Sequence, residues 1–167
     1  ILVVDNDPQS RVISQSLLLD GGYDPVLAMG IGGKLIADAK AKARDKRCAL
    51  ALIDMRLYND ADNEDDSGLK LASEFGDRVQ CIILSGYADQ KILLNVIRNY
   101  KNLSFILKTA SPDSIMEAID AEARKVSAAK RGLKFENVDI LDEISHTALG
   151  SLTRDYPDQT ADILARL

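Results

Sequence analysis

The sequence has few sulfur or imidazole side chains, with two cysteines and one histidine among 167 residues, and it has no tryptophan. Cys48 and Cys81 belong to no CxxC pair or Cys/His cluster, so we interpret them as small buried hydrophobic residues rather than a redox pair. No apolar run approaches the length of a membrane span, and no signal peptide is visible. We therefore expect a protein of the reducing cytoplasm that does not enter a membrane.

Basic residues are outnumbered as well, because 21 Lys and Arg stand against 26 Asp and Glu, a net charge of -5. An acidic balance disfavours non-specific binding to nucleic acid or anionic membranes, so we expect neither as a partner.

The length allows one domain with a hydrophobic core and a short appendage. The sequence opens inside a strand-like run and stops inside a helix-like one, so we expect a fragment of a longer protein.

Short apolar runs alternate with helical patterns along the chain, and no internal repeat is present. Continuous apolar runs are typical of strands that are buried on both faces of a parallel sheet. We predict strands at residues 1–4, 25–28, 49–53, 79–84 and 104–107. We predict helices at residues 8–19, 34–45, 68–75, 89–100 and 112–129, the first capped by Asp7 ahead of Pro8. The alternation indicates an α/β fold with a doubly wound (βα)5 five-stranded parallel sheet.

Polar groups follow four of the predicted strands, at the edge where an open parallel sheet places its ligand site. They belong to Asp5, Asn6, Asp7, Asp54, Ser85 and Lys108. Because the carboxyl ends of parallel strands share one edge, we expect acids, an amide, a hydroxyl and an amine to converge.

Each of these residues also fits a purely structural role. Asp54 and Ser85 are common turn residues, and Asp7 suits a helix N-cap better than a ligand. Lys108 also fits a solvated lysine at the end of a strand.

Four stretches, ILVVDND, LALIDMRL, CIILSGYAD and SFILKTASPDS, resemble the receiver domain of two-component response regulators such as the chemotaxis regulators. They occur in the family's order over residues 1–130. The resemblance implies a flavodoxin-like strand order 2-1-3-4-5 and a receiver domain at 1–130. Residues 131–167 would then form a helical extension or a linker to an output or dimerisation module.

The resemblance also implies that Asp54 accepts a phosphoryl group from a histidine kinase or phosphotransfer protein. Lys108 would pair with the phosphoryl oxygens, and Ser85 would bind one of them after transfer. Phe105 stands at the family's switch-aromatic position, with core packing equally open. Catalysis would be limited to self-phosphorylation and self-dephosphorylation, so we expect a signalling switch rather than an enzyme.

A divalent cation, usually Mg²⁺ although Mn²⁺ is also suitable, would neutralise charge during this transfer. The resemblance assigns Asp5, Asn6, Asp54 and the backbone carbonyl of Arg56 to that cation. The family usually has a second acid where this chain has Asn6, and an amide brings no charge. We therefore expect weaker Mg²⁺ binding than in a relative with two adjacent aspartates.

Two further departures concern the neighbours of Lys108 and Asp54. Thr109 replaces the proline that usually follows the lysine in a cis peptide, so this bond is either trans or strained. The loop at 59–68 is longer than usual, lacks the family's proline at Tyr58, and carries five acids within residues 60–66. That loop is either a mobile solvated segment or a charge filter for partners and phosphodonors.

Three rival functions remain open. Asn6 and Thr109 fit a pseudo-receiver that binds partners without being phosphorylated. An aspartyl-phosphate phosphatase would need an acid where Arg56 stands, and a flavodoxin-like cofactor site would need a phosphate-cradling loop after the first strand. The lone His146, in the 131–167 extension, loosely resembles a kinase phosphoacceptor but suits an ordinary helix position better.

Overall fold

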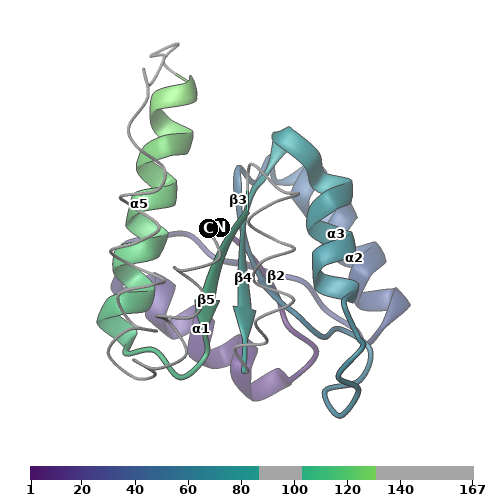
Figure 1. Cartoon of the computed structure of the whole chain (residues 1–167). Coiled ribbons are helices and arrows are strands. Elements are labelled where there is room, and N and C mark those ends of the chain that lie inside the picture. Colours follow the sequence, from purple (N-terminus) through teal and green to yellow (C-terminus); the bar gives the residue numbers. More distant parts are fainter. Residues whose placement is uncertain (87–102, 131–167) are drawn as a thin grey trace, which may run out of the picture. The chain divides into compact units, whose positions relative to one another are not determined.

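The computed structural model describes residues 1–86 and 103–130 of the chain (Figure 1). In this part of the chain, parallel strands form a five-stranded sheet in the order β2-β1-β3-β4-β5. The strands are β1 (Leu2–Val4), β2 (Val26–Leu27), β3 (Leu50–Asp54), β4 (Gln80–Ser85) and β5 (Leu103–Leu107). The predicted α/β fold and its strand order are confirmed.

Helices cover both faces of the sheet, α1 and α5 on one and α2 and α3 on the other (Figure 1). Their bounds are α1 (Pro8–Asp20), α2 (Gly33–Asp45), α3 (Ser67–Phe75) and α5 (Pro112–Lys130), and a 3-10 turn (Gly76–Arg78) follows α3. The helix predicted at 89–100, the extension at 131–167 and His146 lie outside the described residues.

The apolar runs of the strands feed two cores, one on each face of the sheet. Leu52 and Ile53 are adjacent in β3, only 2% and 0% exposed, and they belong to opposite cores. Leu18 of α1 and Ile119 of α5 pack with Leu52, whereas Leu35 of α2 packs on the side of Ile53. Burial on both faces explains why the inner strands carry consecutive apolar residues rather than one at every second position.

The first helix begins where the sequence predicts, because Asp7 caps it. The Asp7 carboxylate accepts hydrogen bonds from the backbone N–H of Gln9 (3.2 Å) and of Ser10 (2.9 Å), and Pro8 is the first helical residue. The Ser10 hydroxyl also donates to this carboxylate. Its hydrogen bond has the largest effect, and together with the two backbone hydrogen bonds it lowers the pKa of Asp7. Asp7 therefore has a structural role beside the site.

The chain divides into two compact units, Ile1–Val126 and Ser127–Leu167. Within the residues that the structure describes, no helix combines the length and apolar character that a membrane crossing requires. Both cysteines are free thiols. Cys81 is buried, as expected, but Cys48 is only partly buried, so the expectation of burial is wrong in part.

Candidate functional site

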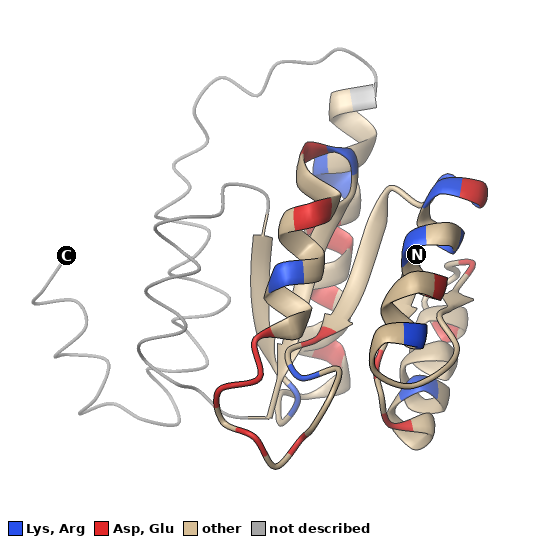
Figure 2. Cartoon of the chain, turned by 90° about the vertical axis from the view of Figure 1, so that its right-hand side faces the viewer, with Lys and Arg blue, Asp and Glu red and all other residues tan. Residues whose placement is uncertain are grey.

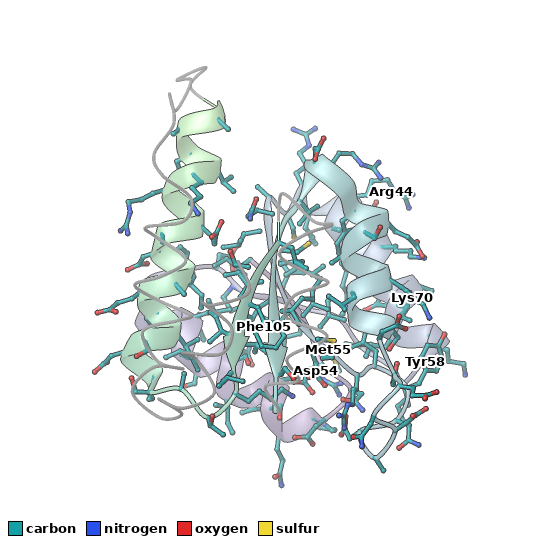
Figure 3. The ribbon with its side chains drawn as sticks, in the orientation of Figure 1. Arg44, Asp54, Met55, Tyr58, Lys70 and Phe105 are labelled. Atoms are coloured by element: carbon teal, nitrogen blue, oxygen red, sulfur yellow. The ribbon has the colours of Figure 1, made fainter. Side chains whose placement is uncertain are left out.

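Three charged side chains meet at the carboxyl edge of the sheet. Asp5 directly follows β1, Asp54 is the last residue of β3 and Lys108 directly follows β5. The Lys108 ammonium Nζ lies 2.9 Å from Asp5 Oδ2 and 3.0 Å from Asp54 Oδ1. Figure 3 shows Asp54 at this end of the sheet, below Phe105 in that view. The convergence predicted from the strand ends is therefore present for these three side chains.

Burial determines the charge state of this cluster. Asp54 is only 4% exposed, and burial raises its pKa to about 6, with the Lys108 ammonium opposing this and the Asp5 charge adding to it. Burial lowers the pKa of Lys108, but the charges of Asp54 and Asp5 outweigh it and raise that pKa above its ordinary value. Lys108 is thus a cation held between two carboxylates, beside an acid whose pKa burial raises.

Asp54→Asn tests the cost of burying this charge. A carboxyl group whose pKa is raised in the folded state stabilises the fold below its unfolded pKa and loses that stability as pH rises through about 6. Asparagine keeps the neutral form, so we expect a free energy of unfolding up to about 3 kcal/mol higher near pH 7. The gain should vanish below pH 4, which urea unfolding at both pH values measures. An equal gain at both would contradict the assignment.

Ser85 ends β4 beside the cluster, and its side chain is buried. Its backbone carbonyl accepts a hydrogen bond from the Lys108 N–H at 2.7 Å, which ties the ends of β4 and β5 together. Phe105 of β5 is partly buried and packs against the core on the α2 and α3 face. That packing fits the core interpretation of Phe105, and its role as a switch stays a prediction.

The residues predicted to bind a cation offer oxygen atoms only. Within residues 1–86 and 103–130, no three His, Cys, Asp or Glu side chains gather in an arrangement that would hold a metal ion. The candidate set therefore has two carboxylates, Asp5 and Asp54, with the neutral oxygens of Asn6 and Arg56. Hard cations such as Mg²⁺ take such oxygen ligands.

The side chain of Asn6 supports a cation at this position. Its Oδ1 atom is buried and has no hydrogen-bond partner in the described part of the chain. A buried acceptor without a partner costs free energy, and coordination of a cation would satisfy it. The donor set and this orphaned oxygen together fit a hard divalent cation.

Figure 2 shows acidic residues, in red, along the loop between β3 and α3. Asn6 Nδ2 donates a hydrogen bond to Asp60 Oδ1 at 3.0 Å. Arg56 Nη1 donates to the backbone carbonyl of Asp60, and Arg56 Nη2 donates to Asn63 Oδ1 at 2.9 Å. Asp60 thus contacts two of the candidate cation-binding residues, and its charge also helps to raise the pKa of Asp54.

Arg11 is a residue of this site that the sequence analysis missed. It lies on α1, is 7% exposed, and its Nη1 donates to the backbone carbonyl of Asp5 at 2.6 Å. The buried Arg11 guanidinium therefore fixes the backbone at the carboxyl end of β1. Its spacing to Ser14 and Leu18, which are also buried, places it on the inward helix face and was the available signal.

Gly68 is a second residue that was missed, because it was assigned only to the start of a helix. A Cβ atom at this position would lie 2.0 Å from the backbone oxygen of Asp54 and 2.8 Å from that of Met55. The Gly68 N–H also donates to the Met55 carbonyl at 2.9 Å. The first turn of α3 therefore rests directly on the backbone that carries Asp54.

The peptide after Lys108 is trans, since no described peptide bond is cis. The Ala110 N–H donates to the Leu107 carbonyl at 3.0 Å and closes a turn across Lys108 and Thr109. Of the two alternatives for this bond, the trans peptide with its own turn geometry is the one observed.

Several solved structures have a similar fold, whereas no family model and no curated protein sequence matches the chain. A CheY-like response regulator receiver domain protein from Methanospirillum hungatei is 21% identical, with a TM-score of 0.60 over 77% of this chain and 95% of that one. The signal receiver domain of a modulated diguanylate cyclase from Desulfovibrio desulfuricans is 20% identical, with a TM-score of 0.57 over 77% and 95%. NtrX from Brucella abortus is 19% identical, with a TM-score of 0.62 over 88% of this chain and 29% of that longer one.

At these identities the likeness is one of fold. Together with the order of its five parallel strands, it defines the class: the chain has the fold of response regulator receiver domains.

Proposed function

We propose that this chain is a phosphorylation-dependent signalling switch of the cytoplasm, with Asp54 as the phosphoacceptor. The observation that carries the proposal is the ion-paired cluster of Asp5, Asp54 and Lys108 at the carboxyl edge of the sheet. Residues 1–130 would form the receiver domain, and residues 131–167 a helical extension or a linker to an output or dimerisation module. The only catalysis would be self-phosphorylation and self-dephosphorylation.

The proposed reaction is an attack of an Asp54 carboxylate oxygen on the phosphorus of a donor. The bond between phosphorus and the donor atom breaks, the donor leaves with the electron pair, and an acyl phosphate forms. Asp54 must be ionised for this attack, and a cation bound beside it would favour the ionised form. The Lys108 ammonium lies within 3.0 Å of the nucleophile and would then neutralise charge on the transferred group.

A divalent cation would complete the site, held by Asp5, Asn6, Asp54 and the backbone carbonyl of Arg56. It would neutralise negative charge on the phosphoryl oxygens. Ser85, at the end of β4, would donate its hydroxyl to one of these oxygens after the transfer. The rotamer of Phe105 on β5 would then report the phosphorylated state to the surface.

A histidine kinase or phosphotransfer protein is the proposed donor. The α1 helix starts beside Asp5 and exposes apolar side chains, Val12 at 61% and Ile13 at 68%. Exposed apolar residues next to a reactive site suit contact with a protein partner.

Incubation with acetyl phosphate and Mg²⁺, followed by intact-mass measurement, tests the proposed function. Wild type should gain the mass of one phosphoryl group, because Asp54 and Lys108 are already in contact. Asp54→Ala should gain none, and omission of Mg²⁺ should slow the reaction. A wild type that stays unmodified, or an Asp54→Ala variant that is modified equally, would refute the proposal.

The second candidate is a pseudo-receiver that binds partners without phosphorylation. It is favoured by Asn6, whose amide brings no charge where the family usually has a second acid, and by Thr109, which follows Lys108 through a trans peptide. The same intact-mass experiment separates the two candidates, since an unmodified wild type supports the pseudo-receiver.

A further inference from the structure

The side chain of Asn6 has two ends with different surroundings. Its Nδ2 atom donates to Asp60 Oδ1 at 3.0 Å, whereas its Oδ1 atom is buried and has no hydrogen-bond partner among the described residues. A carboxylate accepts hydrogen bonds but donates none, so Asp60 selects the nitrogen end of the amide. The oxygen end is thereby turned away from the loop and left available to a ligand.

Arg56 holds the same loop residue from a second direction. Its guanidinium donates to the backbone carbonyl of Asp60 and to the side chain of Asn63. Asn6 and Arg56 are two of the residues proposed to offer an oxygen to the cation. Both also donate a hydrogen bond to Asp60: Asn6 to its carboxylate and Arg56 to its backbone carbonyl.

The Asp65 carboxylate links the two ends of the loop that contains Asp60. Its Oδ2 atom accepts hydrogen bonds from the backbone N–H of Tyr58 and of Asn59, both at 2.9 Å, and its Oδ1 atom accepts one from Ser67 at 3.0 Å. Burial raises the pKa of Asp65, but these hydrogen bonds outweigh it and lower that pKa below its ordinary value. An ionised Asp65 therefore fixes both ends of the segment that presents Asp60.

We propose that Asp60 is a positioning residue of the cation site, acting through the side-chain amide of Asn6. It orients the amide so that Oδ1 is the atom available for coordination. It also supplies a negative charge. An aspartate at position 6 would carry such a charge itself, whereas Asn6 has none and receives it from Asp60 through one hydrogen bond. Carboxylates that orient a metal ligand in this way typically change metal affinity by about 10–100-fold. The inference rests on the proposed function, since it requires a cation between Asp5, Asn6 and Asp54.

Calorimetric titration of Mg²⁺ into the full chain compares wild type with Asp60→Asn. We expect Asp60→Asn to weaken Mg²⁺ binding by about tenfold or more, because the amide loses its charged partner. Glu64→Gln is the matched control, since Glu64 is exposed in the same loop and the substitution removes the same charge. It should change affinity by no more than about twofold, because an exposed, screened charge acts weakly. Equal losses in both variants would overturn the inference.

A double-mutant cycle with Asn6→Asp tests whether the effect of Asp60 passes through Asn6. Aspartate at position 6 has no N–H to donate, so Asp60→Asn should no longer weaken Mg²⁺ binding in that background. If it weakens binding as much as in the wild-type background, the proposed route is wrong.

NMR of the Asn6 side-chain amide in the metal-free protein gives a readout that is independent of cation binding. Asp60→Ala should shift this resonance and Glu64→Gln should not. An unmoved resonance would overturn the inference while leaving the proposed function in place. Absence of Mg²⁺ binding by wild type would instead refute the cation site itself, and the inference with it.

Discussion

Lys108→Met is expected to lower the free energy of unfolding near pH 7 by about 3–5 kcal/mol, because removing one partner of a buried ion pair leaves uncompensated charge. In this chain we expect the upper part of that range, since the one ammonium contacts both Asp5 and Asp54. Urea unfolding measures it. The same variant should not be phosphorylated at a measurable rate, because the positive charge beside the nucleophile is gone.

The pH dependence of this loss identifies its cause. The Lys108 ammonium lowers the pKa of Asp54, so its removal should raise that pKa further above about 6. A raised carboxyl pKa means stability that is lost as pH rises, so the difference from wild type should be small near pH 4 and grow towards pH 7. Adding Asp54→Asn to Lys108→Met should recover part of the loss.

Lys70→Met is the matched control for Lys108→Met. Lys70 is 72% exposed at its side chain and pairs with Asp66 on the surface of α3. Exposed pairs contribute about 0–1 kcal/mol, so this variant should remain close to wild type. A loss for Lys108→Met no larger than the loss for Lys70→Met would contradict the buried cluster.

Gly68→Ala is expected to destabilise the fold by about 3 kcal/mol or more, although alanine is the better helix former. The added methyl group would lie 2.0 Å from the Asp54 carbonyl oxygen, which is a backbone atom, so the backbone of α3 or β3 would have to shift. Relief of the clash would displace Asp54, so phosphorylation should fall as well. Thermal unfolding and intact-mass analysis measure the two effects.

Gly33→Ala is the control for the helix position of Gly68. Gly33 also lies in the first turn of its helix, but a Cβ there would be in ordinary contact, 3.7 Å from the Tyr58 hydroxyl. This variant should be neutral or slightly stabilising, as expected for glycine to alanine in a helix. Equal stability of Gly68→Ala and Gly33→Ala would contradict the close approach at Asp54.

Most of the fold was predictable because the inner strands β1, β3 and β4 are buried on both faces of the sheet. That burial makes the strands continuous apolar runs, which are easy to recognise between helical patterns. The strand ends were less predictable: β3 and β4 each run one residue past the apolar stretch, to Asp54 and Ser85. Backbone pairing of Asp54 with Leu84 and of Ser85 with Leu107 extends them, whatever the polarity of the side chain.

The site was predictable where a residue ends a strand and unpredictable where long-range packing decides. Asp5, Asp54 and Lys108 could be placed together because parallel strands share one carboxyl edge. The contact of Asn6 with Asp60 spans 54 residues along the sequence, and no periodicity governs a loop of that kind. Gly68 likewise has no local signal, since its requirement comes from the backbone of β3.

Mapping the phosphoryl group after trapping with hydroxylamine tests the central claim most directly. Hydroxylamine attacks an acyl phosphate at its carbonyl carbon, releases phosphate and leaves a hydroxamate on the acceptor carboxyl. After incubation with acetyl phosphate and Mg²⁺, peptide mass spectrometry should find that hydroxamate on Asp54. A hydroxamate on Asp60 or another acid of the loop, or none anywhere in the chain, would contradict the assignment of Asp54 as the phosphoacceptor.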